Sequence, residues 1–388
     1  MKILIVPMVG GRGIGPIYRS LAVANAAKEN NEILFLCKEA FISYVTKSGF
    51  DYIEDIEPKQ KFPQGNIIMW NDAAYAMGLC DEEFVQRAFS HQLKVVKNFS
   101  PDIIFTEYNL TICAVANICN IPIVSTFNWA DTSSFSVSGV DHKILYPNAI
   151  DPFNKIFTAY SKTNYLNISE MVTKIPVLVA PTTPMQQPEL EQYNVEYIGE
   201  LLNRDYEIDD SLEVENENIY VYLTSCDLPV AKWVSAIITE LGSLKNPVYI
   251  VANDRVKRFL DGQSIPRNFH INDFIPSLTV MKRSKLVIHA GSANVISGAL
   301  ISGVPSLMIP LSDGERLYNS LAVQKFGCGK IIDEAEFMSK GRLLSVVNEM
   351  LENSDYCSNA TMLGAEIIKL GGAKSIVEYF YDIVKGRS

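Results

Sequence analysis

The chain has 388 residues, of which 48% are hydrophobic and 20% charged, and its formal net charge is −10 at pH 7. This length exceeds one ordinary hydrophobic core and suits two domains. The negative charge argues against a nucleic-acid partner held by a general basic surface, and no apolar run reaches the roughly 18 residues of a membrane span. We therefore expect a globular protein with no nucleic-acid partner and no membrane span.

Cysteine and histidine usage points to a reducing compartment. The seven cysteines form no CxxC pair, and there are four histidines, so the sequence predicts neither a disulfide framework nor a metal site. The amino terminus, MKILIVPMVGG, has one lysine and a short apolar run, which is typical of a first β-strand rather than of a signal peptide. We expect buried free thiols in a cytoplasmic protein.

Strand and helix patterns alternate in the first half of the chain. Predicted strands lie at 2–9, 32–37, 52–56, 103–107 and 121–127, and predicted helices at 17–30, 41–49, 81–98 and 111–120. Repeated β-α units imply a parallel sheet with right-handed crossovers. The next stretch, 128–185, is rich in aromatic residues, asparagine and serine. It predicts irregular helices, either around a pocket or as a simple excursion of the domain.

A second β-α series follows an acidic linker. Predicted strands lie at 219–225, 247–252, 269–275 and 285–290, and predicted helices at 232–244 and 277–284. The predicted divisions are a domain at 1–202, a linker at 203–218, a domain at 219–365 and a C-terminal helix within 366–388 that packs back across the junction. The predicted fold class is α/β, with two tandem Rossmann-like doubly wound domains facing across a cleft at the carboxyl ends of their strands.

Residues 286–330 carry the most informative group of small and polar residues. His289 ends a branched apolar run and is followed by the small-residue segment 290–294. Small residues let a ligand approach the backbone, and the start of the next helix offers free N–H groups to an anion. A further strand leads to the polar segment DGER at 313–316. This order predicts a diphosphate at the first loop and sugar hydroxyls at the second.

Several motifs in a fixed order resemble those of GT-B glycosyltransferases that use nucleotide sugars, especially the natural-product branch of the UDP/TDP-sugar family. In chain order they are GGRGIGPIYRSLAVA, PDIIFTEYN, YIGELL, YLTS and HAGSANVISGALISGVPSLMIPLSDGERLYNS. The resemblance covers nearly the whole chain. It implies an inverting, metal-independent transferase that binds a UDP- or TDP-sugar in the C-terminal domain and a small acceptor, such as a secondary metabolite, in the N-terminal domain. The nucleotide sugar is a co-substrate, and no cofactor is implied.

The same resemblance assigns donor contacts to the C-terminal domain. The implied contacts to phosphate, base and sugar are Thr224, Ser225, Phe274, Ile275, His289, Gly291, Ser292, Asn294, Asp313, Glu315 and Arg316. Two features depart from the family: Gly298 replaces a glutamate that often binds the nucleotide ribose, and the loop after His289 is one residue longer than usual. Arg316 replaces a glutamine and can only donate hydrogen bonds, which suits an unusual sugar or a phosphate.

The Gly-rich loop after the first strand conflicts with the family. The family's general base, a histidine or an aspartate, follows the last glycine of this loop, but here Pro16 follows Gly15, and proline cannot take a proton. Three explanations stay open: another side chain is the base, the acceptor nucleophile is already ionised, or the protein is not a catalyst. The candidate bases are Glu107, which stands at the family's acidic position, His142, Asp131 and His91. The loop is cationic and suits the donor phosphates or an anionic acceptor; its residues include Arg12, Gly13, Gly15 and Arg19.

Aromatic residues of the stretch after the fifth strand are candidates for an apolar acceptor pocket or for plain core: Phe127, Trp129, Phe135 and Tyr146. The leading hypothesis is an inverting glycosyltransferase. One alternative is a non-catalytic GT-B protein that binds a sugar nucleotide or helps a partner enzyme, which Pro16 favours. Another is a GT-B sugar-nucleotide epimerase. The oligomeric state stays open, with a homodimer as one alternative.

Overall fold

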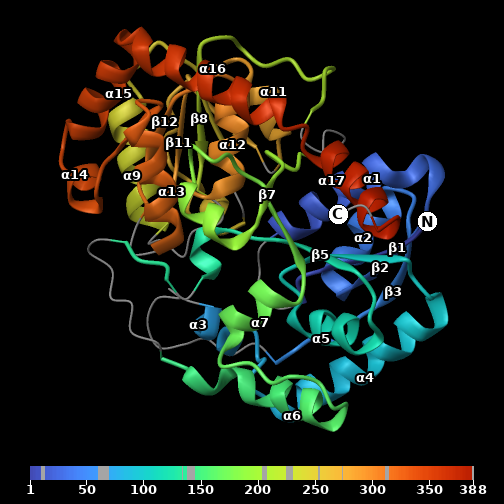
Figure 1. Cartoon of the computed structure of the whole chain (residues 1–388). Helices are drawn as coiled ribbons and strands as arrows, with labels where there is room; N and C mark the ends of the chain where they lie inside the picture. The colour runs from blue at the N-terminus through green and yellow to red at the C-terminus, as the bar shows by residue number, and fades with distance from the viewer. Residues whose placement is uncertain are drawn as a thin grey trace. The chain divides into compact units, whose positions relative to one another are not determined.

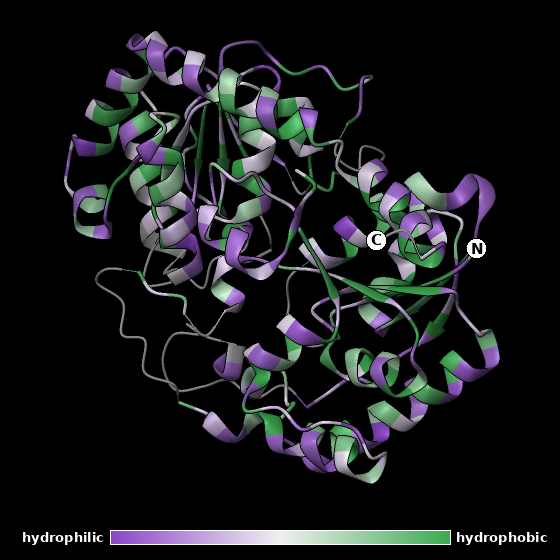
Figure 2. Ribbon diagram, in the orientation of Figure 1, coloured by the Kyte–Doolittle hydropathy of each residue, from purple (hydrophilic) through white to green (hydrophobic). Residues whose placement is uncertain are grey.

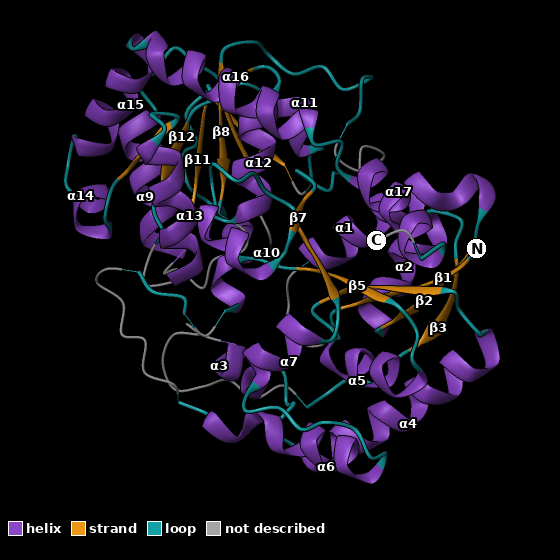
Figure 3. Cartoon of the chain, in the orientation of Figure 1, coloured by secondary structure: helices purple, strands orange, loops and turns teal. Residues whose placement is uncertain are grey.

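The computed structural model describes residues 1–9, 14–59, 70–132, 134–137, 145–202, 208–223, 230–251, 254–272, 274–310 and 314–386. The chain forms two compact units. The N-terminal unit comprises residues 1–203 and 370–388, and the C-terminal unit comprises residues 204–369. Each unit is a parallel sheet covered by helices (Figure 1, Figure 3).

The N-terminal unit is built on a seven-stranded sheet with the order β3-β2-β1-β4-β5-β6-β7. Its strands are β1 (Lys2–Pro7), β2 (Glu32–Cys37), β3 (Asp51–Glu54), β4 (Ile103–Glu107), β5 (Ile123–Thr126), β6 (Val177–Ala180) and β7 (Glu196–Tyr197). Every pair in the sheet is parallel. The central strands β1 and β4 are almost entirely buried, as expected for a sheet covered on both faces. Figure 2 shows strands of this sheet as largely hydrophobic. The strand order reverses between β1 and β4, which is where doubly wound sheets bind ligands.

Helices cover both faces of this sheet. The helices are α1 (Gly15–Ala27), α2 (Glu39–Lys47), α3 (Trp70–Ala76), α4 (Glu82–Phe99), α5 (Leu110–Cys119), α6 (Asp151–Ala159), α7 (Ile168–Lys174) and α17 (Ala373–Val384). On one face α1 packs against α2 and α17, and on the other α4, α5 and α6 pack together (Figure 1). The C-terminal helix α17 belongs to this unit: Phe380 is fully buried and lies 6.1 Å from Phe105 of β4 between ring centroids.

The sheet continues through a region for which the sequence predicted only irregular helices. Strand β6 lies within 128–185, and it pairs with β5 on one side and β7 on the other. The sequence signal was weak because β6 has four residues, Val-Leu-Val-Ala, without alternation. A short apolar run of this kind does not distinguish a buried strand from a helix segment. The helical prediction was wrong for β6, whereas α6 and α7 do occur there.

The C-terminal unit has a six-stranded parallel sheet with the order β10-β9-β8-β11-β12-β13. Its strands are β8 (Asn218–Tyr222), β9 (Val248–Val251), β10 (Phe269–Asn272), β11 (Ser284–His289), β12 (Ser306–Met308) and β13 (Gly329–Ile331). Its helices are α9 (Val230–Leu241), α10 (Asp254–Leu260), α11 (Ser277–Met281), α12 (Ala293–Ile301), α13 (Gly314–Lys325), α14 (Glu334–Met338), α15 (Arg342–Glu352) and α16 (Ser354–Lys369). The strand order reverses between β8 and β11, so His289 at the end of β11 lies at the switch point.

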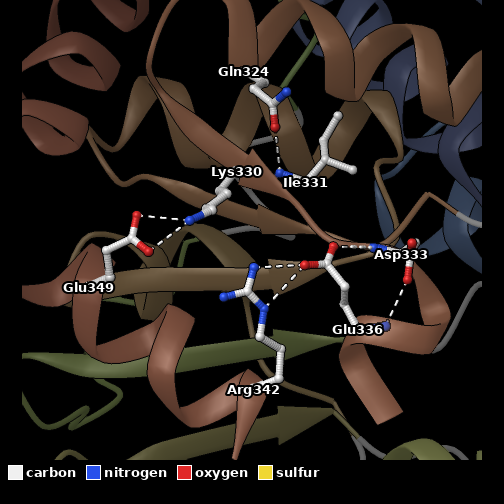
Figure 4. Close-up of polar contacts among 7 residues, drawn as sticks. All are labelled: Gln324, Lys330, Ile331, Asp333, Glu336, Arg342 and Glu349. Carbon is white, nitrogen blue, oxygen red and sulfur yellow. Dashed lines mark hydrogen bonds and ion pairs between the residues drawn. The ribbon is translucent and has the colours of Figure 1, made fainter. Parts of the chain in front are cut away.

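Polar contacts at the β13 end of this sheet fix local structure (Figure 4). Asp333 caps α14: its Oδ1 accepts a hydrogen bond of 2.7 Å from the backbone N–H of Glu336. Arg342 donates to Oε1 of Glu336 at 2.7 Å, and Lys330 pairs with Glu349 at 2.7 Å. These side chains are substantially solvent-exposed, so each pair contributes about 0–1 kcal/mol. We assign this cluster a structural role only.

Candidate functional site

His289 is the last residue of β11 and has no exposed surface. Strand β11 lies between β8 and β12, with His289 opposite Tyr222 and Met308. This central position explains the burial. Desolvation lowers the pKa of His289 to about 3, so the imidazole is neutral at physiological pH.

The hydrogen bonds of the ring define its tautomer. The backbone N–H of Gly291 donates to Nδ1 of His289 at 3.0 Å. Nδ1 is therefore an acceptor, and the single proton of the neutral ring is on Nε2. Within the described residues, Nε2 is buried and has no hydrogen-bond partner. The site thus holds a neutral, buried N–H donor without a partner among the described residues.

Gly291 brings the loop after β11 against helix α13. Its φ is +84°, a left-handed conformation, and a Cβ at this position would lie 2.4 Å from Oγ of Ser320 and 2.8 Å from the carbonyl oxygen of Arg316. Only glycine fits such a conformation and such a close approach. Ser320 is fully buried, and its hydroxyl has no hydrogen-bond partner in the described part of the chain. The sequence did not single out Ser320, because its proximity to Gly291 follows from the packing of α13.

The start of α12 follows this loop directly. Ser292 is the N-cap residue, but its side chain makes no capping hydrogen bond, and Asn294 lies in the first turn. The first N–H groups of a helix have no intrahelical partner and carry the positive end of the helix dipole. His289 therefore lies shortly before a helix start suited to an anion.

The other predicted donor contacts are described in part. Glu315 and Arg316 lie in the first turn of α13, with Glu315 exposed and Arg316 half-buried. Phe274 is 61% exposed and Ile275 is buried, between β10 and α11. Thr224, Ser225 and Asp313 lie outside the described residues. Donor contacts by these residues stay predictions.

Gly298, which replaces the family's ribose-binding glutamate, is packed under α11. A Cβ there would lie 3.1 Å from Sδ of Met281 and 3.5 Å from Cδ2 of Leu278. A glutamate at this position would have to displace Met281. The glycine at this position therefore allows α11 to pack closely against α12.

The Gly-rich loop of the N-terminal unit leads into α1. Gly15 is the first residue of α1, and Pro16 is buried in its first turn, where a proline needs no backbone N–H. Arg12 and Gly13 lie outside the described residues. Their contacts with an acceptor or with phosphates stay predictions.

Arg19 and Glu107 form a buried ion pair beneath α1. Nε and Nη2 of Arg19 donate to Oε2 of Glu107 at 2.9 and 2.7 Å, and the two side chains are 11% and 0% exposed. Burial raises the pKa of Glu107, while the charge and hydrogen bonds of Arg19 lower it. Its basicity is therefore tied to Arg19, and a role as general base stays a prediction that this geometry disfavours.

The remaining candidate bases have structural partners or lie beyond the described residues. Nε2 of His91 is 2.9 Å from the carbonyl oxygen of Glu54. Oδ2 of Asp131 accepts a hydrogen bond of 2.8 Å from the backbone N–H of Asn128 in a capping box. His142 lies outside the described residues. The identity of a base stays open.

A buried carboxyl group that the sequence did not single out lies after β3. Asp55 is 3% exposed, and its Oδ2 accepts hydrogen bonds from Nε2 of Gln92 at 2.8 Å and Nδ2 of Asn109 at 3.4 Å. Burial raises the pKa of Asp55 to about 6, although these hydrogen bonds lower it. The cluster joins β3 to α4 and to the start of α5. Its members are 37 and 54 residues away from Asp55 in the chain, so no local motif marks it.

The aromatic residues named as pocket candidates fall into two groups. Phe127, Trp129 and Phe135 are 1%, 7% and 2% exposed and belong to the core. Tyr146 is half-buried and stacks on Tyr75, with ring centroids 3.8 Å apart and an interplanar angle of 4°. Of these four candidates, Tyr146 has the most exposed side chain.

The described residues were assessed for clusters of metal-ligating side chains and for membrane-spanning helices. They contain no cluster of three or more His, Cys, Asp or Glu side chains able to hold a metal ion. Among the same residues, no helix has both the length and the apolar character needed to cross a membrane.

One family model matches the C-terminal part of the chain. Residues 235–380 match the family described as Erythromycin biosynthesis protein CIII-like, C-terminal domain. Across 98% of both chains, the protein is 21% identical to the "Uncharacterized UDP-glucosyltransferase YojK" of Bacillus subtilis (strain 168).

Solved structures resemble the chain along its length. CalG4, the calicheamicin glycosyltransferase, has a TM-score of 0.76 at 15% identity, covering 100% of this chain and 98% of its own. The spinosyn rhamnosyltransferase SpnG complexed with thymidine diphosphate has a TM-score of 0.75 at 14% identity, covering 98% of this chain and 100% of its own. The two-domain GT-B fold and the resemblance to antibiotic glycosyltransferases are confirmed. Together the matches support a glycosyltransferase of the natural-product type.

Proposed function

Because residues 235–380 form an EryCIII-like C-terminal domain and the chain has the GT-B fold, we propose that it transfers a sugar from a nucleotide diphosphate sugar to a small-molecule acceptor. The C-terminal unit binds a UDP- or TDP-sugar, and the N-terminal unit binds the acceptor. The transfer inverts the anomeric centre. The proposal is supported by YojK, named a UDP-glucosyltransferase, and by SpnG, solved with thymidine diphosphate.

The observation that carries this proposal is the buried Nε2–H of His289, unpaired among the described residues, which precedes the start of α12 in the chain. A diphosphate oxygen placed there accepts a hydrogen bond from a neutral imidazole and from the first N–H groups of the helix. The close approach of Gly291 to α13 sets this loop against the helix that carries Glu315. A carboxylate in that position suits the hydroxyl groups of the donor sugar.

The proposed mechanism is direct displacement at the anomeric carbon. The acceptor oxygen attacks the anomeric carbon as the bond to the diphosphate breaks, and negative charge develops on the leaving diphosphate. The proton of an acceptor hydroxyl passes to a base, whose identity stays open, unless the acceptor oxygen is already ionised. Fixed N–H dipoles of α12 and the Nε2–H of His289 stabilise that charge without reorganisation. These donors supply the stabilisation through protein groups, so no step of the proposed mechanism is routed through a metal ion.

A second candidate function is binding of a nucleotide sugar without catalysis. Pro16 stands where the family has its general base, and Glu107 is paired with Arg19. The two functions differ in turnover. A transferase releases nucleotide diphosphate in proportion to glycoside formed, whereas a non-catalytic protein binds the nucleotide and releases no product with any acceptor.

His289→Ala tests the diphosphate assignment. We expect its affinity for UDP or TDP, measured by isothermal titration, to fall at least about tenfold through loss of a charge-assisted hydrogen bond. His289→Gln, which keeps an N–H donor, is expected to retain part of the affinity. His270→Ala is the control, because His270 is partly exposed and pairs with Glu215. Equal nucleotide affinity in the wild type and a folded His289→Ala variant contradicts the assignment.

A further inference from the structure

The N-terminal unit has a cavity of about 470 Å³ lined by α3, the start of α4 and segment 145–155. Cavities of this size hold small organic ligands.

The starts of two helices place this cavity relative to the sheet: Glu82 begins α4 and Asp151 begins α6. In a parallel β-α unit the helix begins near the carboxyl end of the preceding strand, so α4 starts at the carboxyl side of this sheet. Helix α6 runs alongside α4, because Lys155 pairs with Glu82 and Tyr160 packs on Phe89 one to two turns further along. The cavity therefore opens on the ligand-binding side of the sheet.

The cavity has a flat aromatic wall. Tyr75 of α3 and Tyr146 stack nearly parallel, and both line the cavity together with Leu145, which is 42% exposed. A stacked pair holds its rings in two parallel planes, and its outer faces and edges favour offset or edge contact with another ring. This shape suits a planar ring system rather than a flexible chain.

The charges around the cavity disfavour an anion. Glu82 and Asp151 are acidic lining residues, and Lys155, the lining cation, is paired with Glu82. Partial burial and the neighbouring Tyr75 and Asp72 raise the pKa of Tyr146, which is consistent with a local field that opposes added negative charge. Beneath α1 of the same unit, the positive charge of Arg19 is matched by Glu107.

We propose that this cavity is the acceptor site and that the acceptor is an uncharged, planar, hydroxylated aromatic molecule. This inference rests on the proposed function. The ring system lies against Tyr75 and Tyr146, and the polar rim formed by Glu82 and Asp151 accepts hydrogen bonds from its hydroxyl groups. The choice of acceptor is thus set by helices α3 and α6 of the N-terminal unit.

The test compares two tryptophan substitutions in the full chain. Leu145→Trp fills the cavity, whereas Leu166→Trp makes the same change at a leucine that is 84% exposed and outside it. The probes are alizarin, a planar dihydroxyanthraquinone, and alizarin red S, which carries one further negative charge on its sulfonate. Both are measured by equilibrium dialysis at the same pH. Wild type is expected to bind alizarin about tenfold or more tightly than the sulfonate, because the charge must enter an acidic cavity.

Leu145→Trp is expected to weaken alizarin binding about tenfold or more by occupying the cavity, while Leu166→Trp stays within about twofold of wild type. Tyr146→Ala, compared with the exposed Tyr160→Ala, tests the aromatic wall in the same way. Absence of saturable alizarin binding to wild type, equal affinity for the sulfonate, or unchanged binding in folded Leu145→Trp each overturns the inference.

Nucleotide binding separates this inference from the proposed function. UDP and TDP affinities are expected to be unchanged in Leu145→Trp, because the donor site belongs to the C-terminal unit. Failure of wild type to bind either nucleotide contradicts the proposed function alone. If nucleotide binding is normal and the affinity for alizarin is the same in Leu145→Trp as in wild type, the cavity assignment alone is contradicted.

Discussion

The carboxyl ends of the strands in the two sheets carry different kinds of buried polar group. At the carboxyl side of the N-terminal sheet, buried charged groups have partners within the unit: Arg19 donates to Oε2 of Glu107, and Oδ2 of Asp55 accepts from Gln92 and Asn109. At the carboxyl end of β11, the buried group is a neutral histidine with an unsatisfied donor. One edge therefore offers little net charge to a ligand, and the other offers N–H groups to an anion.

This difference bears on two of the predicted site residues. Glu107 is a candidate base in the sequence because it stands at the family's acidic position, and Arg19 belongs to the cationic loop. Their burial and mutual hydrogen bonds favour a structural role for the pair. His289 is also buried, but its donor, unpaired in the described part of the chain, and the helix start that follows it favour the proposed role in binding.

Breaking the Arg19–Glu107 pair is expected to have the largest effect on stability. Arg19→Met leaves the Glu107 carboxylate buried without its partner, and we expect the free energy of unfolding of the N-terminal unit to fall by about 3–5 kcal/mol. The measurement is urea unfolding of the full chain. Lys174→Met is the control, because it removes an exposed i,i+4 pair with Glu170 and is expected to cost about 0–0.5 kcal/mol.

The double variant Arg19→Met, Glu107→Gln sharpens this test. Removing both charges avoids an unpaired buried carboxylate, so its cost is expected to be well below the sum of the two single costs. Additive costs, or a single Arg19→Met cost below about 1 kcal/mol, are incompatible with a structural ion pair. In that case Glu107 becomes available again as a base.

Gly291→Ala is expected to have the next largest effect, on the opposite edge. The substitution strains a left-handed backbone and places a methyl group 2.4 Å from Oγ of Ser320, so we expect a loss of about 3 kcal/mol in the C-terminal unit and weaker nucleotide binding. Gly262→Ala is the matched control: its φ is +74°, but nothing lies within 4 Å of the added methyl group. It is expected to cost about 1 kcal/mol, from backbone strain alone. Equal costs for the two variants mean that the loop does not press on α13.

The sequence predicted the strand-helix alternation of both units well because long apolar runs and helical spacing are local signals. It missed β6, whose four apolar residues show no period. It named both Arg19 and Glu107, but their pairing depends on the register that places Pro7 beside Glu107 and on packing across 88 residues of chain. Tyr75 was not identified at all, since its partner Tyr146 is brought to it by tertiary packing. Residues at strand ends were thus predictable, and contacts between distant elements were not.

The smallest expected effect is a divergence of the two units with pH. Asp55 has a pKa of about 6 in the folded state, above the ordinary aspartate value, so the folded N-terminal unit binds more protons than the unfolded one between about pH 4 and pH 6. The contribution of Asp55 to the stability of this unit is present at low pH and is lost as pH rises through about 6. His289 has a folded pKa of about 3, below the ordinary histidine value. Its contribution is complete above about pH 6.5 and is lost as pH falls toward 3.

In the window between pH 6 and pH 4, acidification is therefore expected to stabilise the N-terminal unit and destabilise the C-terminal unit, each by up to about 1.4 kcal/mol per pH unit. Hydrogen exchange in mild urea, read peptide by peptide and corrected for intrinsic exchange rates, follows each unit separately. Asp55→Asn should flatten the pH dependence of the N-terminal unit alone, and His289→Gln that of the C-terminal unit alone. If both units lose stability in parallel and neither substitution changes a slope, the buried groups at the two edges are not what distinguishes them.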